Sequence, residues 1–176
     1  MILELVDQRT RPTDLPVDEQ RLAALVAELG RPEWIVNLVL VEDAVMADLY
    51  ARWYGGEGPT DVLSFTYLEN AGAGAPDLAR GTGGAAGDLW VAPGDGPEAV
   101  TAGEVILAPA FVARRCRAEG WDLATEWALL LVHGSLHLLG WRHARAAERR
   151  QMRAQESAVL ARGGYAHPLP AEGTDH

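Results

Sequence analysis

The sequence predicts an α+β protein in which a small mixed sheet packs against helices, one of them a long central helix that carries a histidine cluster. Two observations predict this class. Short β-rich segments occur among amphipathic segments without the strict alternation of a doubly wound sheet. In addition, residues 122–139 are mostly apolar and long enough for about five helical turns. A chain of 176 residues is expected to form one domain, residues 1–176.

The first part of the chain is predicted to contain three strands and two helices. Residues 2–7 alternate between apolar and polar side chains, and residues 34–41 are apolar and rich in β-branched side chains, so both are predicted strands. Apolar side chains at helical spacing predict a helix over 17–30, and another over 42–56 that ends at a glycine pair. Residues 59–68 are predicted to form a turn and then a strand.

The second part of the chain is predicted to contain a loop, two strands and three helices. Residues 69–86 are rich in glycine and alanine and are predicted to form a mobile surface loop. Residues 87–93 and 103–109 are similar in sequence and are predicted strands, joined as a hairpin. Helices are predicted over residues 110–119, 122–139 and 144–162, and a polar tail over residues 163–176.

The composition is that of a soluble globular protein, with 48% hydrophobic and 23% charged residues. The longest apolar runs, 105–113 and 127–132, are shorter than the roughly 20 residues of a membrane span. The first ten residues lack the basic start of a signal peptide. The single cysteine, Cys116, cannot form an internal disulfide. We therefore expect a cytoplasmic protein without a membrane partner.

The net charge of −10 argues against a nucleic-acid partner, but the charges are distributed unevenly. Residues 1–110 hold 6 arginines and 18 acidic residues, whereas residues 111–162 hold 9 arginines and 5 acidic residues. Local positive charge matters more for anion binding than the global sum. The basic segment is therefore compatible with contacts to RNA phosphates, and a solvated arginine-rich helix surface is the alternative of equal weight.

Three of the five histidines lie within eleven residues, at positions 133, 137 and 143. His133 and His137 are four residues apart on the predicted helix, so their rings project from one face, one turn apart. Gly140 can adopt a positive φ and end the helix, which allows His143 to turn back toward the same point. This spacing predicts one zinc ion per chain, bound by His133, His137 and His143.

Other interpretations of the histidines are open to test. They could be hydrogen-bonded core residues, and nickel or copper would also suit three nitrogen ligands. Three protein ligands leave one position for water, as in catalytic zinc sites. The spacing H-x-x-x-H-x-x-G-x-x-H also occurs in metzincin proteases, whose general base is a glutamate at the position of Gly134. Without that base, proteolysis is not expected.

The segment "HGSLHLLGWRH" resembles the H-G-x-L-H-L-x-G-Y-D-H signature of the YbeY family of zinc-dependent endoribonucleases. Three other segments resemble motifs of that family in the same order: "PTDVLSF" (59–65), "GEVILAP" (103–109) and "GGYAHP" (163–168). The resemblance implies an α+β fold and a zinc ion on the three histidines. It also implies a role in maturing the 3′ end of small-subunit rRNA and in ribosome quality control.

Two positions depart from the family pattern. The family has Tyr-Asp before the third histidine, where this chain has Trp141 and Arg142. The family also has an arginine five residues before the proline of "PTDVLSF", where this chain has Tyr54, with Arg52 two residues earlier. Arg52 replaces that arginine only if the helix has already ended there, because two helical residues are about 200° apart.

We therefore expect a metal-dependent endoribonuclease that cuts single-stranded RNA, with RNA and the ribosome or its small subunit as partners and no DNA partner. Arg142 and Ser64 are predicted to contact the substrate. No catalytic residue is assigned, and the nucleophile is either hydroxide or the ribose 2′-OH. The alternatives are a non-catalytic, zinc-containing ribosome-assembly factor and a metallopeptidase.

Overall fold

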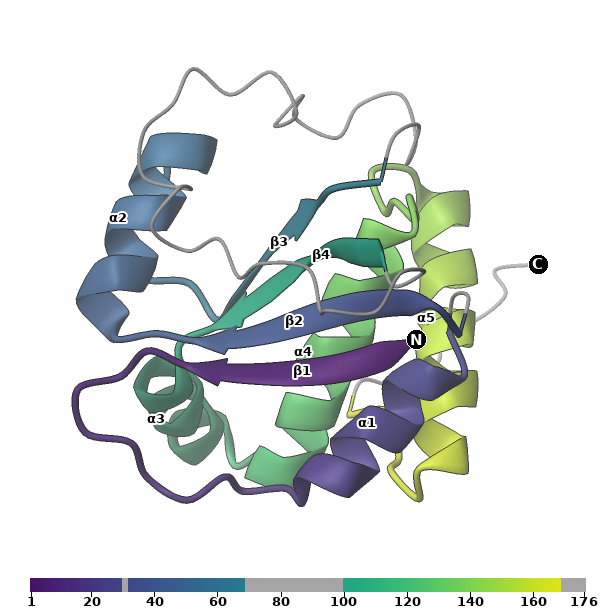
Figure 1. Ribbon diagram of the computed structural model, residues 1–176, viewed down its shortest axis with the longest axis horizontal. Coiled ribbons are helices and arrows are strands. Elements are labelled where there is room, and N and C mark those ends of the chain that lie inside the picture. Colours follow the sequence, from purple (N-terminus) through teal and green to yellow (C-terminus); the bar gives the residue numbers. More distant parts are fainter. Residues whose placement is uncertain (30–31, 69–99, 169–176) are drawn as a thin grey trace.

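The computed structural model describes residues 1–29, 32–68 and 100–168, and in this part of the chain four strands form one mixed sheet. The strand order is β1–β2–β4–β3 (Figure 1). Strands β1, β2 and β4 are parallel, and β3 runs antiparallel to β4. Their bounds are Ile2–Asp7 for β1, Trp34–Leu40 for β2, Val62–Thr66 for β3 and Val100–Leu107 for β4. This sheet confirms the predicted fold class.

The helices cover the sheet unequally. Alternate residues of β2, such as Val36 and Leu38, are fully buried in a core shared with α1, α4 and α5, whereas Val39 on the other face packs in a smaller cluster with residues of α2. Figure 1 shows α4 running behind the sheet, with α5 beside it. The helices are α1 (Glu19–Ala27), α2 (Asp43–Tyr54), α3 (Pro109–Glu119), α4 (Leu123–Leu138) and α5 (Ala146–Arg162).

The predicted elements agree with the structure, with shifted ends. Helix α1 is shorter than the predicted 17–30, and it begins later because Asp18 is its N-cap, where the Asp18 carboxylate accepts a hydrogen bond from the Arg21 amide. Strand β4 begins at Val100 rather than at Gly103, because Gly103 lies inside the ladder next to a β-bulge and pairs with Val36. The predicted loop 69–86 and strand 87–93 lie outside the described residues.

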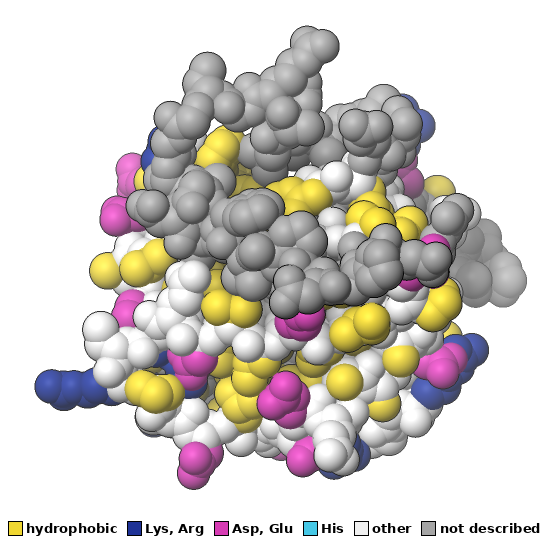
Figure 2. Space-filling model, in the orientation of Figure 1, with side chains coloured by type: hydrophobic (Ala, Val, Ile, Leu, Met, Phe, Trp, Pro, Cys, Tyr) yellow, Lys and Arg dark blue, Asp and Glu magenta, His cyan; other side chains and the backbone are white. Residues whose placement is uncertain are grey.

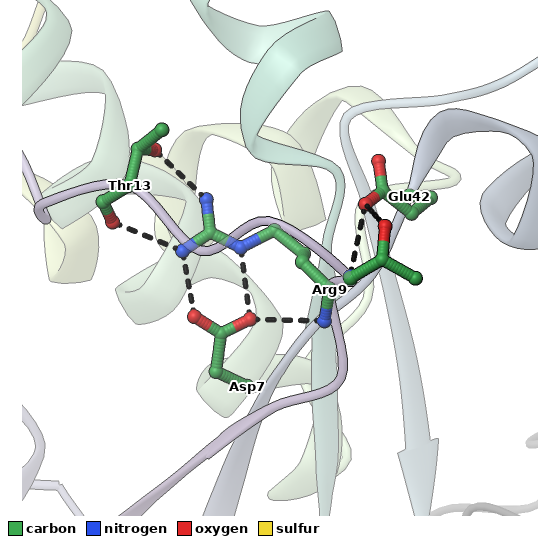
Figure 3. Close-up of polar contacts among 5 residues, drawn as sticks. Asp7, Arg9, Thr13 and Glu42 are labelled. Atoms are coloured by element: carbon green, nitrogen blue, oxygen red, sulfur yellow. Dashed lines mark hydrogen bonds and ion pairs between the residues drawn. The ribbon is translucent and has the colours of Figure 1, made fainter.

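Polar contacts fasten the segment that follows β1. The Arg9 guanidinium donates to both carboxylate oxygens of Asp7, at 2.8 and 2.7 Å, and to Thr13 (Figure 3). The backbone N–H and the hydroxyl of Thr10 donate to Glu42 Oε1, immediately before α2. These bonds connect the end of β1 to the start of α2. Within the described residues, no helix is both long and apolar enough to cross a membrane.

Candidate metal centre

Helix α4 carries the first two histidines on a face that is only partly buried. Its N-cap is Asp122, as the sequence predicts, and the Asp122 carboxylate accepts a hydrogen bond from the Thr125 amide at 2.8 Å. The apolar side of α4, including Trp127 and Leu131, is fully packed into the core. His133 and His137 project from the remaining face, and their ring centroids lie 4.6 Å apart.

The turn after α4 brings the third histidine back to this face. Gly140 has a φ of 87°, so the prediction of a positive φ at this position is confirmed. The Trp141 amide donates to the Leu136 carbonyl at 3.1 Å, which closes the turn. The ring centroid of His143 then lies 4.9 Å from that of His137. One nitrogen from each histidine falls within 4.8 Å of the other two, as a shared metal ion would require.

Two acceptors outside the cluster fix the protons on His133 and His137. The Nδ1 of His137 lies 3.0 Å from the Trp141 carbonyl oxygen, and the Nδ1 of His133 lies 2.7 Å from Glu156 Oε1. Burial alone would raise the pKa of Glu156, but hydrogen bonds from His133 and His167 outweigh it and hold that pKa below its usual value. Because both oxygens accept, each Nδ1 carries a proton, and in a neutral ring the Nε2 then keeps its lone pair.

The two Nε2 atoms face each other. His133 Nε2 and His137 Nε2 are 3.1 Å apart. Burial, followed by the neighbouring His133 and His143, lowers the pKa of His137 to about 4, so His137 is neutral at neutral pH and its Nε2 is available as a metal ligand. Two nitrogens bound to one tetrahedral zinc at 2.0–2.1 Å stand about 3.3 Å apart. The donor set therefore fits a metal ion.

A pocket of about 320 Å³ opens beside the cluster and includes His133 and His143 in its wall. Arg115 also lines this pocket, and it is paired with Asp61 and, at 2.7 Å, with Glu126 of α4. The Arg115 guanidinium also lies over the Trp121 ring, 4.8 Å from its centroid. Arg149 and Arg153 of α5 complete a rim in which both signs of charge occur.

The two residues predicted to contact substrate, Ser64 and Arg142, are not among those that line this pocket. Ser64 is half-buried on β3 and faces α4, where its hydroxyl oxygen would lie 2.8 Å from a Cβ at Gly134. Arg142 lines a separate pocket of about 400 Å³, together with Glu148 and Gln151. Helix α2 continues through Tyr54, so Arg52 does not take that position. A role in substrate binding for Ser64 and Arg142 stays a prediction.

Two residues of the site were missed by the sequence reasoning, Glu156 and His167. Glu156 is a buried acid on the same face of α5 as the apolar residues Met152 and Val159. A charged residue within an apolar helix face is the sequence signal that could have identified it. His167 was assigned to a polar tail, but its side chain is only 7% exposed and its Nε2 lies 3.1 Å from Glu156 Oε2. Nothing in the local sequence reveals that contact.

The fold and the site define an α+β protein with a three-histidine cluster suited to a metal ion. Residues 12–164 match the family described as Endoribonuclease YbeY, and the chain belongs to this family. It is 39% identical over 125 residues to the Endoribonuclease YbeY of Rhodococcus erythropolis and 38% identical to that of Mycobacterium leprae. The match covers 71% of this chain and 61% of each relative, so it spans about three fifths of their length.

The fold also has a counterpart among solved structures. The solution structure of TM1509 from Thermotoga maritima superposes with a TM-score of 0.51 and covers 96% of this chain and 99% of that protein. Only 17% of the aligned residues are identical. This likeness therefore concerns the fold alone.

Proposed function

We propose that this chain is a metal-dependent endoribonuclease that cuts single-stranded RNA with a zinc ion held by His133, His137 and His143. The observation that carries the proposal is the convergence of the three histidines, in which the Nε2 atoms of His133 and His137 lie 3.1 Å apart. Relatives named Endoribonuclease YbeY support RNA as the substrate. The resemblance to that family further supports action on rRNA, with the small ribosomal subunit as partner, in the cytoplasm.

The protein's own groups prepare the site for this chemistry. Glu156 and the Trp141 carbonyl hold the two Nδ1 protons, so that both Nε2 atoms stay available as ligands. Arg149 and Arg153, on the rim of the adjacent pocket, place positive charge where an RNA phosphate would enter. A bound zinc ion would supply a Lewis acid for a phosphoryl oxygen or lower the pKa of a water molecule.

Peptidase activity is disfavoured by the packing at Gly134. A Cβ at this position would lie 2.7 Å from Val105 Cγ1, so the helix leaves no room for the glutamate that metzincins use as a base. A zinc-containing assembly factor without catalysis is the remaining alternative. An assay of RNA cleavage distinguishes it from the endoribonuclease, whereas metal content does not.

The test is cleavage of a defined single-stranded RNA, with a duplex of the same sequence and casein as control substrates. We expect cleavage of the single strand only, loss with chelator and recovery with added zinc. His137→Ala should reduce the rate roughly a hundredfold or more, because metal catalysis contributes several kcal/mol and 1.36 kcal/mol is tenfold in rate. Arg162→Ala, on the exposed end of α5, is the matched control. An intact RNA despite bound zinc would favour the assembly factor.

A further inference from the structure

A buried carboxylate links the metal centre to the C-terminal segment of the chain. Glu156 projects from α5, with a side chain that is 8% exposed. Both of its oxygens are used: Oε1 lies 2.7 Å from His133 Nδ1, and Oε2 lies 3.1 Å from His167 Nε2. One carboxylate thus joins a candidate ligand on α4 to residue 167, which follows the last helix.

His167 reaches Glu156 because residues 163–168 are fastened to the body of the protein. Gly164 has a φ of 78°, and the next amide, that of Tyr165, donates to the Leu160 carbonyl at 2.9 Å. The Tyr165 ring is buried, with the Arg21 guanidinium 5.1 Å from its centroid. Arg21 also donates to the Gly163 carbonyl at 3.2 Å. The segment is therefore held by α1 and α5.

We propose that Glu156 and His167 are positioning residues of the metal centre, so that metal binding and docking of residues 163–168 stabilise each other. Glu156 fixes the ring orientation and the Nδ1 proton of His133, which leaves Nε2 directed at the cluster. His167 in turn fixes the Glu156 carboxylate. A carboxylate behind a ligating histidine contributes roughly 10–100-fold in metal affinity. Such coupling is reciprocal, because whatever strengthens metal binding is itself strengthened by the metal.

The proposal rests on the metal site of the proposed function but not on its RNA chemistry. The first test is zinc affinity, measured by competition with a chromophoric chelator. Glu156→Gln keeps the side-chain volume and removes the charge, and it should weaken zinc binding about tenfold or more. His167→Ala should weaken it less, and the double variant should lose less than the product of the two effects, because both residues act through one contact chain. Glu28→Gln is the control: its carboxylate pairs with Arg162 of α5 and, among the described residues, with no histidine.

The second test is the reverse effect, read from trypsin cleavage after Arg162, which releases residues 163–176. Zinc should slow this cleavage in the unaltered protein, but much less in Glu156→Gln. Unchanged zinc affinity in both Glu156→Gln and His167→Ala would overturn the proposal. The proposal would also be overturned if the variants bound zinc more weakly but zinc did not slow trypsin cleavage after Arg162 in the unaltered protein. A protein that binds zinc with this coupling but leaves RNA intact would refute the proposed function and leave the inference standing.

Discussion

Gly134 has no side chain, and this allows helix α4 to pack closely against the sheet. It follows His133 on α4, and a Cβ there would lie 2.7 Å from Val105 Cγ1 and 2.8 Å from Ser64 Oγ. Contacts this short require a neighbour to move, and Val105 is a fully buried, β-branched residue of the central strand. Helix α4 therefore lies directly against β3 and β4, and this close approach sets the depth of both histidines.

Gly134→Ala should destabilise the protein despite the better helix propensity of alanine. Overpacking costs typically 1–3 kcal/mol and the propensity gain is about 1 kcal/mol, so we expect a net loss of up to about 2 kcal/mol in urea unfolding. The variant should also bind zinc more weakly, because α4 must move away from the sheet. Gly55→Ala is the contrast: apart from its chain neighbours, no atom of the described residues would lie within 4 Å of the added Cβ, but the φ of 66° costs about 1 kcal/mol, and zinc affinity should not change. A Gly134→Ala protein more stable than the original would contradict this packing argument.

The candidate ligands could be predicted from sequence, whereas the contacts that orient them could not. His133, His137 and His143 are related by one helical turn and one glycine turn, which are local and periodic. Glu156 reaches His133 from 23 residues away, and that contact depends on how α5 packs against α4. No periodicity in the sequence encodes that packing.

Strand β4 carries a buried acid at the centre of the sheet. Glu104 is 3% exposed and pairs in register with Asn37 of β2 and Phe65 of β3. Burial raises the pKa of Glu104 to about 7, and a hydrogen bond with Tyr67 offsets this only in part. The sheet therefore favours the protonated, uncharged form of this side chain.

The raised pKa of Glu104 predicts a pH-dependent stability. Between pH 4.5 and about 7 the unfolded chain loses this proton while the folded protein keeps it, so the free energy of unfolding falls as pH rises. The loss amounts to at most about 3 kcal/mol. Glu104→Gln should remove this part of the pH dependence, measured by urea unfolding at pH 4.5 and pH 8. The exposed Glu28→Gln should show the pH dependence of the unaltered protein, and parallel curves for all three proteins would refute the assignment.

At the level of elements, the sequence predicted where strands and helices occur along the chain better than it predicted which strands lie side by side in the sheet. Helix α4 could be placed closely, because Asp122 and Gly140 mark its ends chemically. The position of β4 between β2 and β3 depends on long-range pairing, and the boundary expected at Gly103 is wrong because that glycine is paired inside the strand, next to a bulge. Helix capping depends on residues near one another in sequence, whereas strand order depends on pairing between distant segments.

The whole molecule is acidic, with a net charge of −10, yet its metal-site side carries arginines. Figure 2 shows acidic side chains spread over the face it views, with arginines at the margins. The arginines of the pocket rim come from α5, at the right of Figure 1. This asymmetry would orient an approaching polyanion, since opposite charge attracts it to the pocket and like charge repels it from the acidic face.

The three arginines at positions 142, 149 and 162 allow this orientation to be tested. Arg149 lines the pocket of the histidine cluster, Arg142 lines the separate pocket, and Arg162 pairs with Glu28 at the far end of α5. Each is changed to alanine in a His137→Ala background, and affinity for single-stranded RNA is measured at several salt concentrations, without cleavage. Arg149→Ala should weaken binding about tenfold and lower the salt slope by about one ion, because a charged contact is worth 1.5–3 kcal/mol.

Arg162→Ala removes the same charge from the same helix and should have little effect on RNA binding. Arg142→Ala decides whether the predicted substrate contact belongs to the same path: a loss as large as that of Arg149→Ala would extend the RNA path across both pockets. Similar small losses in all three variants would mean that only the summed charge matters. In that case the pocket rim would have no specific part in RNA binding, since a nonspecific electrostatic effect does not depend on which arginine is removed.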